Sequence, residues 1–182
     1  MRSRMLAASA AAVLIPAATT FLSGMPAAEA STICHQGAIK ASWSNSFPTA
    51  HRPGQSVTVR TTLYNKTGTT LRGLFFDYSI GVPPNHNHWG PTPTVSWRWG
   101  HGSWHRFGLS RNNSSPQHDW YSEDHTLGAL YAHKSKTLQF KVAFHKGDPT
   151  GTYSGIAMIG ARATCGITLL AVAGNLGPAY RP

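Results

Sequence analysis

Residues 55–64 read Gln-Ser-Val-Thr-Val-Arg-Thr-Thr-Leu-Tyr, with an apolar or β-branched residue at every second position. Successive side chains of a strand point to opposite faces, so one face is formed by Val57, Val59, Thr61 and Leu63. The other face is polar. This alternation predicts a half-buried β-strand, and Asn65-Lys66-Thr67-Gly68 predicts the turn that follows it.

The same alternation recurs along the chain and predicts further strands at residues 74–80, 95–99, 104–109, 137–144, 153–161 and 167–172. Proline-rich residues 81–93 and polar residues 110–119 predict loops. No segment has the period of an amphipathic helix. About seven short strands separated by turns predict an all-β sandwich or barrel.

Two segments resemble bacterial extracellular immunoglobulin-like domains of the cell-adhesion-related and conserved-repeat type. Pro53–Val59 followed by Tyr64–Gly68 is similar to the opening of those domains, and Ser135–Val142 followed by Gly151-Thr152-Tyr153 is similar to their closing half. The resemblance spans roughly residues 37–165 and implies an immunoglobulin-like β-sandwich without catalytic residues. The His- and Trp-rich segment 85–125 departs from the family pattern.

Residues 1–30 have the three parts of a cleavable signal peptide. Arg2 and Arg4 precede an Ala- and Leu-rich stretch, which ends in Ala28-Glu29-Ala30. Pro16 interrupts that stretch, so it predicts no transmembrane anchor. We therefore expect a secreted, extracellular protein with the sandwich at residues 31–173 and a loose tail at 174–182.

The net charge of the expected mature chain is strongly positive. The whole chain has 16 Lys and Arg and six Asp and Glu; without Arg2, Arg4 and Glu29, 14 and five remain, a net charge of +9. Such a charge favours polyanions such as anionic cell-wall polymers, or it serves solubility alone. The chain has no arginine-rich tract or nucleic-acid motif, so nucleic acid is not an expected partner.

Two cysteines, Cys34 and Cys165, remain after the expected cleavage. In an exported chain, two thiols most simply form one disulfide. The alternative is a metal-ligand or reactive pair, but the chain lacks the Cys-x-x-Cys spacing typical of such sites.

Ten histidines point to a possible metal site. His86 and His88 are two residues apart and fall on one face of an extended segment, and His101 and His105 follow nearby. Imidazole nitrogens bind copper and zinc. An extracellular copper- or zinc-binding protein is therefore one alternative function, whereas ordinary surface histidines would need no cofactor.

Acid–base catalysis has few candidates. The residues of the 118–125 cluster are His118, Asp119, Trp120, Tyr121, Ser122, Glu123, Asp124 and His125. Its carboxylates match in kind the pair that a glycosidase uses, so a hydrolase is a further alternative. A solvated acidic loop is the simpler interpretation, and nucleophile-elbow and His-Glu-x-x-His motifs are absent.

Aromatic residues are concentrated in the same region. Trp89, Trp104, Trp120 and Tyr121 are candidate ligand contacts, because indole and phenol rings stack on sugars. Trp97 and Trp99 share a face with Val95, and we expect them in the core. Together these observations predict a non-catalytic secreted domain that binds the cell envelope or an extracellular polymer.

Overall fold

The computed structural model describes residues 37–43, 48–83, 90–113, 118–163, 166–174 and 177–182, and these residues contain strands and no helix. The seven strands of five or more residues are β1 (Ile39–Trp43), β3 (Ser56–Asn65), β4 (Leu74–Gly81), β5 (Thr94–Trp99), β10 (Ser135–Ala143), β12 (Ser154–Ala163) and β13 (Gly166–Ala173). The short strands are β2 (Thr49–Ala50), β6 (His105–Phe107), β7 (Ser110–Arg111), β8 (Asp119–Tyr121), β9 (His125–Thr126), β11 (Gly151–Thr152) and β14 (Ala179–Tyr180). Within the described ranges, no helix is long and apolar enough to cross a membrane.

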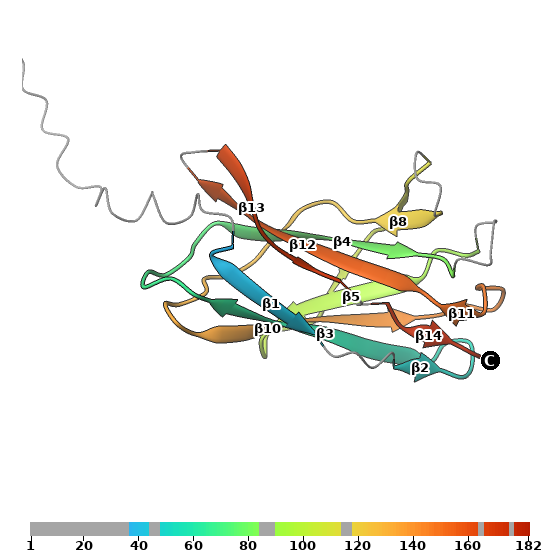
Figure 1. The fold of residues 1–182 in the computed structure, drawn as a ribbon. Coiled ribbons are helices and arrows are strands. Elements are labelled where there is room, and N and C mark those ends of the chain that lie inside the picture. The colour runs from blue at the N-terminus through green and yellow to red at the C-terminus, as the bar shows by residue number, and fades with distance from the viewer. Residues whose placement is uncertain (1–36, 44–47, 84–89, 114–117, 164–165, 175–176) are drawn as a thin grey trace, which may run out of the picture.

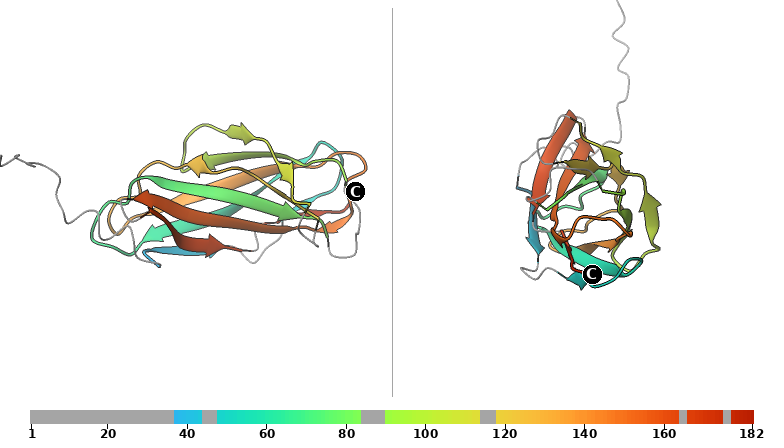
Figure 2. Two further views of the ribbon diagram at one scale, coloured as in Figure 1. Left: turned by 90° about the horizontal axis from the view of Figure 1, so that it is seen from above. Right: turned by 90° about the vertical axis from the view of Figure 1, so that its right-hand side faces the viewer.

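Two main sheets form an immunoglobulin-like sandwich (Figures 1 and 2). One sheet has the order β1-β3-β10-β5-β6, and the other has the order β13-β12-β4-β8-β7 with β9 beside β4. A third, small sheet of order β11-β14-β2 closes one end of the molecule. β1 contacts β13, so one edge of each main sheet meets the other sheet.

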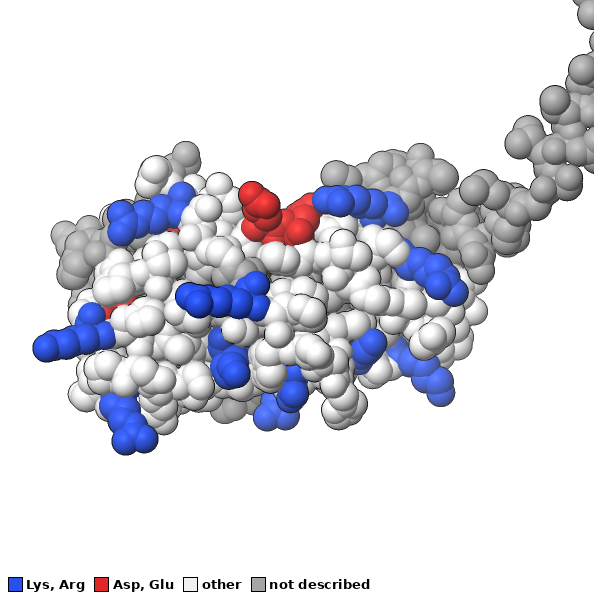
Figure 3. Space-filling model, turned by 180° about the vertical axis from the view of Figure 1, so that it is seen from behind, with Lys and Arg blue, Asp and Glu red and all other residues white. Residues whose placement is uncertain are grey.

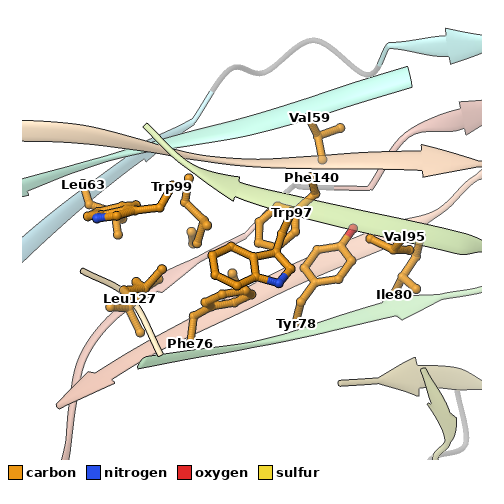
Figure 4. Packing of buried hydrophobic residues seen from close by; sticks show 14 of the residues in the cluster. Val59, Leu63, Phe76, Tyr78, Ile80, Val95, Trp97, Trp99, Leu127 and Phe140 are labelled. Atoms are coloured by element: carbon orange, nitrogen blue, oxygen red, sulfur yellow. The ribbon is translucent and has the colours of Figure 1, made fainter. Parts of the chain in front are cut away.

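Aromatic side chains from both sheets fill the space between them (Figure 4). The rings of Phe140 and Tyr78 stack with centroids 4.2 Å apart, and Phe76 meets Trp97 edge to face at 4.9 Å. Such geometries add about 0.5–1.5 kcal/mol per pair beyond the burial of area. Trp97 and Trp99 are each only 9% exposed, which confirms the predicted core position of both residues.

Most of the strand predictions are confirmed. The segments predicted at 55–64, 74–80, 95–99, 137–144, 153–161 and 167–172 correspond to β3, β4, β5, β10, β12 and β13 within a residue or two, whereas 104–109 contains only the three-residue β6. The expected loop at 110–119 is wrong at both ends, because β7 and the start of β8 pair with each other there. β1 was not predicted, because its five residues, Ile-Lys-Ala-Ser-Trp, are too few to show a clear period of two.

The described part of the C-terminal segment is folded rather than loose. β14 pairs with β11 and, in parallel, with β2, and both Ala179 and Tyr180 are buried. The Tyr180 ring stacks on Phe144 with centroids 4.8 Å apart. A Cβ on Gly177 would lie 1.8 Å from the carbonyl oxygen of Tyr153, so the two backbones approach in a way that only glycine allows.

Several predictions concern residues outside the described ranges. They are the signal peptide of residues 1–30, the disulfide between Cys34 and Cys165, and the proposed contacts of His86, His88 and Trp89. These stay predictions.

Candidate functional site

The outer surface of the β1-β3-β10-β5-β6 sheet is rich in cations and is called the basic face below. Because Val59, Phe140 and Trp97 point into the core, the residues that alternate with them point outward. Its cationic side chains are Lys40, Arg60, Arg98, Arg106 and Lys141. None of these five strands contains an aspartate or a glutamate. The face is therefore positive without internal neutralisation.

Strand register sets the cations in rows across the basic face. Arg60 lies opposite Gln139, and Gln139 lies opposite Arg98 on its other side. In the next row, Lys141 is flanked by a serine and a threonine, and Arg106 continues the row on β6. The hydroxyl and amide groups between the cations therefore provide hydrogen-bond donors and acceptors on the same surface as the charges.

Trp104, which precedes β6, lies among these cations. The Arg98 guanidinium and the Lys141 ammonium each lie 4.7 Å from the centroid of its ring. Cation–π contacts of this kind contribute about 0.5–1 kcal/mol at exposed sites. Arg98 also donates a 3.0 Å hydrogen bond to Oε1 of Gln139, whose Nε2 donates to the carbonyl of Gly100 at 3.3 Å. The half-buried indole thus holds two cations in place on the face.

The other aromatic candidates are divided between core and surface. Trp120 is fully buried, so it packs in the core and is not available to an external ligand. The sequence led to the wrong expectation because it placed Trp120 next to a loop, whereas β8 pairs with β4 and turns the indole inward. Tyr121 points the other way and is 45% exposed.

The described histidines do not form one cluster. His101 is exposed in the turn after β5, whereas His105 packs on Trp97 with ring centroids 4.9 Å apart. Among the described residues, no group of three or more His, Cys, Asp or Glu side chains is arranged to hold a metal ion. No cofactor is positively indicated by this part of the chain.

Four of the five carboxylates of residues 31–182 line one groove on the opposite sheet. This groove, called the acidic groove, has a volume of about 780 Å³. Its lining residues are Asp77, Ser79, Asn112, Asp119, Tyr121, Ser122, Glu123, Asp124, Met158 and Arg162. Figure 3 shows acidic side chains gathered in a notch between basic ones. The fifth carboxylate, Asp148, is buried in the turn after β10.

The acidic groove brings together the carboxylates of the 118–125 cluster and adds Asp77, which the sequence did not connect with them. Burial, and then the negative charge of Asp124, raises the pKa of Asp77. Asp124 itself forms a 2.7 Å ion pair with Arg162. Tyr121 and Met158 add exposed apolar surface to the groove. A carboxyl with a raised pKa has the character of a proton donor. However, the neighbouring Asp124 is engaged in the ion pair with Arg162.

We expect the free energy of unfolding to decrease as the pH falls through about 6.5. The pKa of His125 is lowered by burial against Phe76 and Trp97, and His105 lowers it further, while Glu123 and Asp124 oppose the shift. Below the usual histidine pKa, the unfolded chain therefore binds the proton more tightly than the folded chain. Urea unfolding at about pH 7.5 and pH 5.5 measures the free energy of unfolding on either side of the usual histidine pKa.

The variant His125→Gln should flatten that pH dependence, because glutamine does not titrate. Asp77 and Asp148 have raised pKa values, so their protonation favours the folded state and stabilises the protein as the pH falls. This opposite effect belongs to the more acidic range in which carboxyl groups titrate. An equally steep decrease in His125→Gln would show that another group is responsible.

Comparisons with known proteins identify the fold and no family. No protein-family model matches the chain, and a search of the curated proteins found no match. The solved structure of AvmM, which catalyses macrocyclization in alchivemycin A biosynthesis, is similar over 81% of this chain and 90% of that one, with a TM-score of 0.60 and 9% identity.

Two other solved structures are similar at lower TM-scores. A family IIIa CBD from Clostridium cellulolyticum is similar over 80% of this chain and 98% of that chain, with 16% identity and a TM-score of 0.35. The collagen-binding subdomain of the Enterococcus faecalis surface protein ACE is similar over 76% of this chain and 100% of that chain, with 9% identity and a TM-score of 0.27. At such identities a likeness concerns the fold alone, and this chain's fold is an all-β, immunoglobulin-like sandwich.

Proposed function

We propose that this protein is a non-catalytic binding domain whose basic face binds an anionic extracellular polymer. The observation that carries the proposal is the unequal distribution of carboxylates between the two sheets. All five strands of the basic face lack carboxylates, while four of the chain's carboxylates line the acidic groove on the opposite sheet. A surface that carries several cations and no carboxylate attracts a polyanion.

Trp104 adds a contact that charge alone does not provide. Its indole lies close to the charged groups of Arg98 and Lys141, so a sugar ring that reaches it also meets two cations. Aromatic rings with a polar surround combine apolar contact with orientation of the ligand. The proposal is therefore that charge brings the polymer to the face and Trp104 helps to hold it.

Export belongs to the same proposal. The segment of residues 1–30 has the composition of a cleavable signal peptide, and an exported +9 domain meets anionic envelope polymers as its first partners. The proposed disulfide between Cys34 and Cys165 also requires an oxidising compartment. Amino-terminal sequencing of the protein recovered from the culture medium tests the export step.

Co-sedimentation of residues 31–182 with purified cell wall tests the binding step. We expect binding at roughly 0.1 M salt that weakens at roughly 1 M, because exposed charges are screened there. Trp104→Ala should weaken binding about tenfold, through loss of the ring and of the order that it imposes on two cations. Lys141→Gln should weaken it about threefold, as expected for one exposed ionic contact.

The matched control for charge is Lys146→Gln. Lys146 is exposed in the turn after β10 and lies outside the basic face, so the same loss of one charge there should change binding less than twofold. Equal effects of Lys141→Gln and Lys146→Gln would show that net charge, and not this face, attracts the polymer. Absence of binding at both salt concentrations would overturn the proposed function.

A further inference from the structure

A small hollow lies at one end of the basic face, next to the turn that follows β5. Its volume is about 230 Å³, enough for several water molecules at about 30 Å³ each. The lining residues are Gly100, His101, Ser135, Lys136, Thr137 and Gln139. Gln139 also belongs to the row of Arg60 and Arg98, so the hollow adjoins the basic face. Lys136 starts on the side of β10 that carries Leu138 and Phe140, and it reaches the hollow at the end of β5.

The side-chain hydrogen-bond donors that line this hollow come from β10 and from the turn after β5. Lys136 provides an ammonium group, His101 an imidazole, and Ser135 and Thr137 hydroxyl groups. No aspartate or glutamate lines it. An anion that enters therefore meets donors and one fixed positive charge without a competing carboxylate.

Local structure holds Lys136 in this position. Its ammonium lies 4.9 Å from the centroid of the Trp99 ring, which is itself buried in the core. Gly100 has a φ of +62°, and a Cβ at that residue would come within 2.7 Å of Cε of Lys136. The absence of a side chain at Gly100 is what allows the lysine stem to lie across the turn.

The remaining polar group of the hollow is also fixed. Gln139 accepts from Arg98 and donates to the Gly100 carbonyl, so its amide bridges β5 and β10 at the edge of the hollow. The Arg98 guanidinium is thereby engaged with Gln139 and with the ring of Trp104. Lysine, and not an arginine fork, is the cation that lines the hollow.

We propose that this hollow binds one phosphate group of the polymer, so that phosphodiester-linked polymers are the preferred ligands of the basic face. The inference rests on the proposed function and specifies its ligand. A tetrahedral phosphate presents oxygens in several directions, so it can accept from donors on both β10 and the turn after β5, and lysine binds phosphate as a point charge. A planar carboxylate is matched best by the paired donors of an arginine.

The test compares two polymers of equal charge and length, a synthetic polyphosphodiester and polygalacturonate, against residues 31–182 at roughly 0.1 M salt. We expect the polyphosphodiester to bind about tenfold more tightly, as one additional charge-assisted contact predicts. Lys136→Met keeps the aliphatic stem over Trp99 and removes the charge. It should abolish the preference and leave the affinity for polygalacturonate within about twofold of the unsubstituted protein.

Lys134→Met is the matched control, because Lys134 is exposed in the preceding turn and does not line the hollow. It should reduce both affinities slightly and equally, and the preference should survive. Equal binding of the two polymers, or equal effects of Lys136→Met and Lys134→Met on the preference, would overturn this inference while the proposed function stands. Failure of the unsubstituted protein to bind either polymer would overturn both.

Gly100→Ala gives a second, independent variant. It keeps every charge but displaces the lysine stem, so it should reduce the preference for the polyphosphodiester without lowering the affinity for polygalacturonate. Circular dichroism and thermal unfolding confirm that the variant is folded before its binding is measured. A folded Gly100→Ala protein with an unchanged preference would show that the position of Lys136 does not matter.

Discussion

Replacing Asn65 by alanine should lower the free energy of unfolding by about 3 kcal/mol, although Asn65 is a polar residue at the end of a strand. Its side chain is fully buried, and Nδ2 donates to the carbonyls of Thr69, Leu130 and Tyr131 at 2.7, 3.0 and 3.2 Å. Oδ1 accepts from the backbone N–H of Thr67 at 2.9 Å and from its hydroxyl at 2.7 Å. Alanine would leave these backbone groups without their partner in a site that water does not reach.

Urea unfolding of Asn65→Ala beside Asn113→Ala measures this effect. Asn113 is exposed after β7, and its replacement should change stability by no more than about 0.5 kcal/mol. Asn65→Asp is informative as well, because it keeps the acceptor for Thr67 but turns an oxygen toward three carbonyls. It should be at least as destabilising as alanine. A stability of Asn65→Ala close to that of the unsubstituted protein would show that the turn reorganises around the missing amide.

The sequence predicts Asn65 as a turn residue but not as a buried bridge. The turn signal is local, whereas two of the three carbonyls that Asn65 reaches belong to residues 65 and 66 positions later in the chain. Alternation within β3, β4, β5 and β10 was visible because burial on one face imposes a period of two over many residues. The short strands β2, β7, β11 and β14 carry too few residues to show any period, and their pairing is decided by the fold around them.

The sequence predicted a basic, aromatic-containing site but not where in the fold its residues lie. The excess of basic residues was evident, but their alignment on one face depends on the register of β3 with β10 and of β10 with β5. The acidic groove shows the same limit. Asp77 lies more than 40 residues before Asp119 in the sequence, and only the arrangement of β4, β8 and β12 places them on one surface. Trp104 was predicted as an exposed contact because it flanks turn residues, and the structure places it half-buried just before β6.

The loss of the expected disulfide should be the largest single change in stability. Cys34 stands five residues before Ile39, the first residue of β1, and Cys165 directly precedes Gly166, the first residue of β13. β1 and β13 contact each other. A covalent link between Cys34 and Cys165 would close a loop of nearly the whole domain. In the chain-entropy model such a loop contributes on the order of 4–5 kcal/mol, and Cys34→Ser should lose that amount.

The pattern among variants distinguishes a disulfide from two separate thiols. Cys34→Ser, Cys165→Ser and the double variant should lose the same stability, because each removes the same bond. A reducing agent should destabilise the unsubstituted protein to that level and leave the double variant unchanged. A thiol assay on unfolded protein from an oxidising host should detect free thiols only after reduction. Two titratable thiols without reduction, or losses that add in the double variant, would show that the cysteines are not bonded and that the sandwich holds its two sheets together by packing alone.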